Sequence, residues 1–154
     1  MRHISLAVAL TAAAATAATV PLPAGAAPDT EVFVVSTQFW DGPSPVVAAT
    51  GPFAGCTSVQ ELDGAQAIQT GPNSVLFVGT KELDCADGTV TIAYEATINT
   101  RSGRKTFGTW SVVDSTLDGV AFGGGRLTGD AARCELLPGA EGCILDTFTG
   151  SVGG

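Results

Sequence analysis

The stretch TVTIAYEATINT, residues 89–100, alternates between two kinds of side chain more regularly than any other part of the chain. Successive side chains of a β-strand point to opposite faces, so residues two positions apart share a face. One set of positions is apolar and the other is rich in threonine, which predicts a strand with one buried and one solvated face. The predicted buried face comprises Val90, Ile92, Tyr94, Ala96 and Ile98.

Turn signals and further strand-like runs flank this stretch on both sides. ADG (residues 86–88) predicts a tight connection from SVLFVGTKELDC (residues 74–85), and RSGR (residues 101–104) predicts a turn into KTFGTWSVVD (residues 105–114). Roughly seven or eight such runs, with no convincing helix between them, are typical of an antiparallel sandwich or barrel. The long runs lack the prolines that would blunt an open edge. We therefore expect an all-β fold, an antiparallel eight-stranded barrel.

Three consecutive glycines, residues 123–125, follow the predicted turn at Asp118 and Gly119. A phosphate-binding loop would need a helix directly after the glycines, whereas RLTGD (residues 126–130) alternates like a strand. We interpret the glycines as part of a strand that coils sharply around a small barrel. They would also leave room for an aromatic ring, with Trp110 and Phe107 as candidates. The glycine-rich end GSVGG, residues 150–154, is expected to fray.

Residues 1–26 have the pattern of a secretory signal peptide. A basic start is followed by an alanine-rich run over residues 4–20, and AGA at residues 24–26 has the small residues of a cleavage site. A membrane anchor is disfavoured, because a span needs roughly 20 strongly apolar residues. We therefore predict a secreted, extracellular protein with a single β-barrel domain over residues 27–154 and no transmembrane segment after cleavage.

Charge and composition exclude several classes of function. The leader contains one of the seven basic residues and none of the fifteen acidic ones, so its removal changes the net charge from −8 to about −9. Such a chain repels phosphate backbones, and we predict no nucleic-acid partner. The leader also contains His3, the only histidine. The remaining domain cannot form a Ser-His-Asp triad or a histidine-containing zinc site, and we predict no metal and no cofactor.

The four cysteines predict two disulfides in an exported chain, for which three pairings are possible. Cys134 and Cys143 flank a segment with turn residues, so we pair them with each other and Cys56 with Cys85. A metal site made of all four cysteines is disfavoured, because the short Cys-x-x-Cys spacing of such sites is absent.

Residues 52–130 resemble the allene oxide cyclase barrel-like family, to which plant dirigent proteins are related. The resemblance rests on GTWSVV (residues 108–113) followed by a turn and a glycine-rich strand, and on FVGTK (residues 77–81) followed by a tight hairpin. It implies an eight-stranded barrel with an apolar lumen, in a homodimer or homotrimer, that steers the cyclisation or coupling of hydrophobic intermediates. The family's usual glycine-rich entry segment is replaced by STLDGVAF (residues 115–122), and no catalytic residue is carried over. GTW is also similar to avidin-like and lipocalin-like barrels.

The candidate ligand-binding residues follow from the predicted buried face. Tyr94, the only tyrosine, could hydrogen-bond a ligand, although a lone half-buried tyrosine is more often a core residue. Arg126 could hold an anionic head group, or it could be a solvated charge on the outer face. Glu82 is a weak acid or base candidate. The remaining lumen candidates are Val90, Ile92, Ala96, Ile98 and Trp110, and Trp40 is a further aromatic candidate for a pocket.

Two hypotheses about function remain open at this point. The first is a secreted barrel that binds an apolar small molecule without chemistry, or acts at the cell surface. The alternative is a cyclase or isomerase of the allene oxide cyclase or dirigent type. No converging acid–base set can be named from the sequence, which favours the non-catalytic hypothesis.

Overall fold

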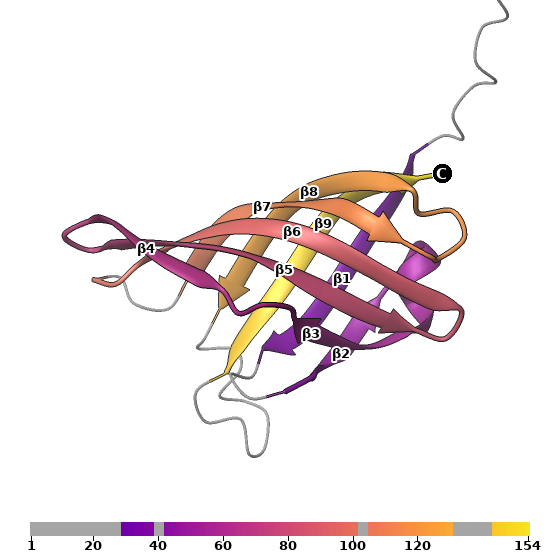
Figure 1. The fold of residues 1–154 in the computed structure, drawn as a ribbon, viewed down its shortest axis with the longest axis horizontal. Helices are drawn as coiled ribbons and strands as arrows, with labels where there is room; N and C mark the ends of the chain where they lie inside the picture. Colours follow the sequence, from indigo (N-terminus) through magenta and orange to yellow (C-terminus); the bar gives the residue numbers. More distant parts are fainter. Residues whose placement is uncertain (1–28, 39–41, 102–104, 131–142) are drawn as a thin grey trace, which may run out of the picture.

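The structure, a computed structural model, describes residues 29–38, 42–101, 105–130 and 143–154. These residues form nine strands and one short 3₁₀ helix, η1 (Gly51–Gly55), in a single continuous sheet (Figure 1). The strands are β1 (Thr30–Gln38), β2 (Ser44–Ala49), β3 (Cys56–Glu61), β4 (Gln66–Gly71), β5 (Ser74–Cys85), β6 (Gly88–Asn99), β7 (Lys105–Ser115), β8 (Phe122–Asp130) and β9 (Ile144–Gly153).

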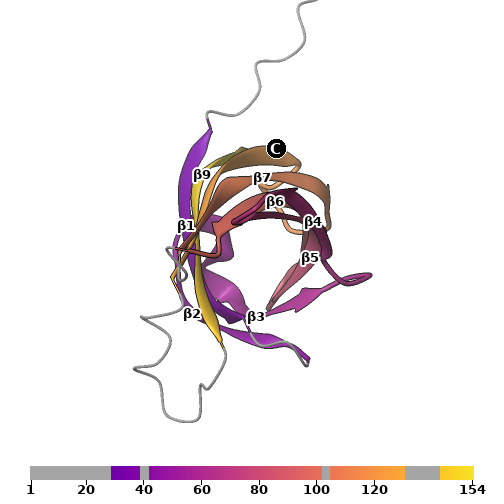
Figure 2. The ribbon, with the colours of Figure 1, turned by 90° about the vertical axis from the view of Figure 1, so that its left-hand side faces the viewer.

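The sheet closes on itself because one strand has partners at both ends of the strand order. That order is β3-β2-β1-β9-β8-β7-β6-β5-β4, and β3 also pairs with β5, from Cys56 opposite Cys85 to Glu61 opposite Lys81. Eight strands therefore form a closed antiparallel barrel, which Figure 2 views nearly end-on, and the predicted eight-stranded barrel is confirmed. β4 pairs with the first half of β5, beyond the end of β3.

The regularly alternating stretch at residues 89–100 lies almost entirely in β6. This strand pairs with β5 along its whole length, from Ser74 opposite Asn99 to Cys85 opposite Gly88. The hairpin between them turns at Ala86 and Asp87, as predicted. The threonine-rich side of β6 faces outward, and the apolar side contributes to the core of the barrel.

Apolar side chains fill the middle of the barrel and close one of its ends. Phe53 of η1 packs edge-on against Trp110, with the ring centroids 6.5 Å apart, and Phe148 also packs edge-on against Trp110, with the centroids 6.2 Å apart. Leu117 and Val120, from the loop between β7 and β8, join the same cluster near the β5–β6 hairpin. This cluster therefore closes the end of the barrel that lies at the β5–β6 hairpin.

The glycine triplet lies in strand β8, which confirms the strand interpretation. Gly125 pairs with Trp110 on one side and with Gly150 on the other. A Cβ atom at Gly125 would collide with the carbonyl oxygen of Thr149 and lie 2.6 Å from the Cα of Gly150. The glycine is therefore needed for close approach of two backbones. Phe107, the other aromatic candidate, lies on the outer surface and is 62% exposed.

The predicted disulfide between Cys56 and Cys85 is confirmed. Cys143 is also disulfide-bonded, whereas Cys134, its predicted partner, lies outside the described residues, as do the predicted leader and Trp40.

The prediction that residues 150–154 fray was wrong, because most of them belong to β9. Val152 is 0% exposed and pairs with both Thr30 of β1 and Gly123 of β8, so the neighbouring strands hold the segment from both sides.

We predict that Gly125→Ala destabilises the barrel by about 1–3 kcal/mol, because the added methyl group forces two paired backbones apart. Gly71→Ala is the matched control, since its Cβ would meet only the Cβ of Ser74 at 3.7 Å. Urea unfolding of both variants measures the difference. Equal stability of the two variants would contradict the role assigned to Gly125.

Candidate functional site

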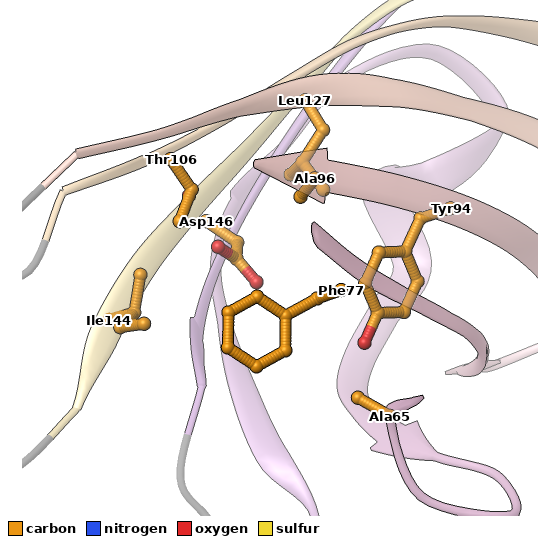
Figure 3. Close-up of a pocket in the computed structure, with 8 residues that line it drawn as sticks. All are labelled: Ala65, Phe77, Tyr94, Ala96, Thr106, Leu127, Ile144 and Asp146. Carbon is orange, nitrogen blue, oxygen red and sulfur yellow. The ribbon is translucent and has the colours of Figure 1, made fainter. Parts of the chain in front are cut away.

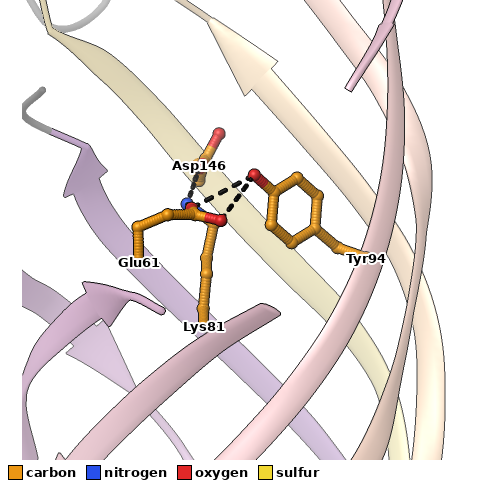
Figure 4. Close-up of polar contacts among 4 residues, drawn as sticks. All are labelled: Glu61, Lys81, Tyr94 and Asp146. Atoms are coloured by element: carbon orange, nitrogen blue, oxygen red, sulfur yellow. Dashed lines mark hydrogen bonds and ion pairs between the residues drawn. The ribbon is translucent and has the colours of Figure 1, made fainter. Parts of the chain in front are cut away.

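Four polar side chains from four strands meet inside the barrel (Figure 4). They are Glu61 at the end of β3, Lys81 on β5, Tyr94 on β6 and Asp146 on β9. Each side chain points into the barrel. Lys81 lies on the same face of its strand as the buried Leu83, and Asp146 lies on the same face as the buried Phe148. The closed register brings Lys81 into contact with Asp146, which is 65 positions away in the sequence.

Lys81 is the centre of this cluster. Its side chain is 3% exposed, and its Nζ lies 3.4 Å from Oε2 of Glu61 and 3.4 Å from Oδ2 of Asp146. The same Nζ lies 5.0 Å from the centroid of the Tyr94 ring, within the range of a cation–π interaction. A buried ammonium group is tolerated only when it is paired, and two carboxylates provide the pairing here.

Tyr94 points its hydroxyl group at Glu61. The phenol lies 3.0 Å from Oε1 and 3.1 Å from Oε2 of that carboxylate, to which it donates its only proton. Burial, followed by the negative charge of Glu61, raises the pKa of Tyr94 well above its ordinary value. The phenol is therefore a permanent donor to Glu61 and presents lone pairs in other directions.

Asp146 is the most buried acidic group of the cluster, at 3% exposure. Burial raises the pKa of its carboxyl group, and the neighbouring Lys81 ammonium opposes that rise. Oδ2 is the oxygen that faces Lys81. Within the described part of the chain, no residue donates a hydrogen bond to Oδ1.

A small pocket lies beside this cluster, toward the end of the barrel away from the β5–β6 hairpin (Figure 3). It offers about 40 Å³ to the centres of water-sized molecules, and its walls are largely apolar. Asp146 and Tyr94 connect the pocket to the polar cluster, and Figure 3 shows the Phe77 ring between them. The lining residues are Ala65, Phe77, Tyr94, Ala96, Thr106, Leu127, Ile144 and Asp146.

The structure places two of the predicted lumen residues, Tyr94 and Ala96, in the pocket wall. Val90, Ile92 and Trp110 lie in the filled part of the core. Ile98 is half-buried, near the end of β6, and does not line the pocket.

Two of the candidate residues, Arg126 and Glu82, lie on the outer side of the barrel wall, and for Arg126 the structure agrees with the alternative of a solvated charge on the outer face. Arg126 is exposed on the outer face of β8, opposite Thr109 and Thr149, because it alternates with the buried Leu127. Glu82 lies between the buried Lys81 and Leu83 and therefore points outward. Neither side chain faces the lumen.

Sequence reasoning missed Glu61, Lys81 and Asp146, although a signal for each of them exists. Glu61 shares the parity of the buried Val59. Lys81 shares the parity of Phe77 and Leu83, and Asp146 shares that of Phe148. A charged residue on the apolar parity of a strand indicates a buried, paired charge.

With this geometry in place, the chain can be compared with known proteins. No family model, curated protein or solved structure matches it. The resemblance to the allene oxide cyclase barrel-like family and the expected homodimer or homotrimer therefore stay predictions. Among the described residues, no helix is long and apolar enough to span a membrane, and no group of acidic, cysteine or histidine side chains is arranged to hold a metal ion.

We predict that Tyr94 stays neutral in alkaline solution for as long as the barrel is folded. Because Tyr94 is the only tyrosine, the near-ultraviolet absorbance of tyrosinate reports on this one group. The absorbance should rise only together with loss of the β-sheet circular dichroism signal, since the unfolded phenol ionises near pH 10. Ionisation near pH 10 in the folded protein would contradict the buried pairing with Glu61.

A second prediction concerns the pH dependence of stability. A raised pKa means that the contribution of Asp146 to stability is greatest below its ordinary pKa, about 3.9, and is lost as the pH rises. Asp146→Asn keeps the shape but does not titrate. Its unfolding free energy should therefore rise relative to that of the wild type between about pH 4 and pH 7. A fall in the relative unfolding free energy of the variant over this range would show that Lys81 lowers the pKa of Asp146 by more than burial raises it.

Proposed function

We propose that this protein is a secreted binding protein that holds one small, largely apolar molecule in the pocket between Tyr94 and Asp146. The observation that supports this most directly is the pocket itself. Its walls are apolar, and its few polar groups are concentrated on one side, which is the usual composition of a small-molecule site. The Cys56–Cys85 disulfide is compatible with the oxidising environment of an exported protein.

The size of the pocket limits what it can hold. A water molecule needs about 10–15 Å³ of such volume, so the available 40 Å³ corresponds to a few heavy atoms or to one end of a longer molecule. Trp110, Phe148 and Phe53 fill the barrel further in. The ligand would therefore occupy the end of the barrel near Tyr94 and Ala96, rather than the whole apolar face of β6.

A cyclase or isomerase is the second candidate, and the polar cluster is the observation that favours it. Tyr94 with Glu61, and Asp146 with Lys81, are two pairs of titratable groups beside the pocket. Such pairs are what acid–base catalysis requires. Turnover would need a proton to move between Asp146 or Tyr94 and a bound substrate, whereas simple binding requires none.

The experiment uses three probes that share a branched alkyl tail and differ in the polar group: isoamyl alcohol, isoamylamine and methyl isobutyl ketone. Calorimetry should detect binding of at least one of them to the wild type. Ala96→Leu should abolish that binding, because the larger side chain fills the pocket.

Ala93→Leu is the matched control for this substitution. Ala93 lies three positions away in β6, where the side chain points away from the lumen, and the control should bind as the wild type does. Circular dichroism verifies that both variants fold. The proposal would be abandoned if none of the probes binds to the wild type, or if Ala96→Leu binds as well as the control.

A further inference from the structure

We propose that the pocket selects a small apolar amine and holds its ammonium head group against Asp146. This inference rests on the proposed function and specifies the class of ligand. It follows from three features of the site: where the hydrogen-bond donors are directed, what charge the cluster carries, and what surrounds the position of the head group.

The donors of the cluster are directed at its own acceptors. The Tyr94 proton is donated to Glu61, and the Lys81 ammonium lies between Glu61 and Asp146. Lys81 has a third N–H group, but Lys81 does not line the pocket. The pocket-lining groups that remain for a ligand are the second oxygen of Asp146 and the lone pairs of the Tyr94 oxygen, which are acceptors. Thr106 can donate or accept, so it does not discriminate between ligands. A ligand that brings donors is complementary to this arrangement, and a carbonyl is not.

The charge of the cluster also favours a cation. Two carboxyl groups, those of Glu61 and Asp146, face one ammonium, Lys81, among the described residues of the barrel interior. Burial favours the neutral form of the Asp146 carboxyl group and raises its pKa, and a ligand ammonium beside it would stabilise the charged carboxylate. The chain as a whole has a formal net charge of −8, which raises the local concentration of cations around the protein.

The walls of the pocket suit the two parts of an alkylammonium ion. Figure 3 shows the Phe77 ring next to the Asp146 carboxyl group and the Tyr94 ring beyond it, so aromatic surface borders the position of the head group. Leu127 and Ile144 supply apolar surface for the alkyl tail.

The three probes test this inference separately from binding itself. Isoamylamine should bind the wild type about tenfold more tightly than isoamyl alcohol or methyl isobutyl ketone, because a hydrogen bond to a charged partner exceeds one between neutral groups. Equal or tighter binding of the alcohol or the ketone would overturn the selection for an amine and leave the binding proposal standing. Failure of all three probes would overturn both.

Single substitutions then identify the carboxyl group that selects the amine. Asp146→Asn should weaken binding of isoamylamine by about tenfold and change that of isoamyl alcohol by less than about twofold. Glu61 does not line the pocket. Glu61→Gln should therefore weaken binding of isoamylamine by a smaller factor and leave binding of isoamyl alcohol unchanged. Glu95→Gln, at an exposed position of the same strand as Tyr94, is the control and should change neither.

Undiminished binding of isoamylamine to Asp146→Asn would overturn the inference. Where Asp146→Asn does not fold, undiminished binding of isoamylamine to Glu61→Gln would overturn the inference instead. Loss of affinity for the amine alone supports the inference, and equal loss for the amine and the alcohol shows that the cluster shapes the pocket without selecting charge.

Discussion

The ladder between β3 and β5 is the constraint on which the rest of this structure depends, because it turns an open sheet into a barrel. It is short, and each end is reinforced by a side-chain interaction. The Cys56–Cys85 disulfide joins the strands at one end. At the other end Glu61 lies directly opposite Lys81 and forms an ion pair with it. A covalent bond and an ion pair thus hold together the β3–β5 ladder, which is the seam of the barrel.

The ion pair at the seam also determines what the interior can contain. Lys81 reaches from the seam to Asp146 on β9, which pairs with β1 and β8 and belongs to the other side of the barrel. Without an ammonium group nearby, a carboxylate as buried as that of Asp146 would be expected to be neutral. Buried pairs of this kind contribute little net stability, so their presence is better explained by a requirement for charge at this position.

The sequence was sufficient to predict the fold because its signals are local. Alternation along residues 89–98 and turn residues such as Asp87 and Gly88 act within a few positions of the chain. The site was not predictable in the same way. Which inward residues of distant strands meet is set by the register of a closed barrel, and Lys81 meets Asp146 only through that closure.

The outward position of two ligand candidates follows from strand parity. Arg126 and Glu82 were weighed for their chemistry, although both alternate with buried neighbours and must therefore point outward. Parity, applied consistently, would have replaced Glu82 by Lys81. The same parity applies to Glu61, which lies two positions after the buried Val59 of β3.

The same interruption that ends the closing ladder also accounts for the pocket. β3 stops at Glu61, and β4 begins only at Gln66, where it takes over the edge of β5 that β3 has left. Ala65, in the gap between them, lies in the pocket wall. The last residue of the closing ladder therefore supplies the acceptor for Tyr94, and the segment that follows it contributes Ala65 to the wall of the pocket beside Asp146. Closure of the barrel and one side of the pocket both depend on this change in strand pairing.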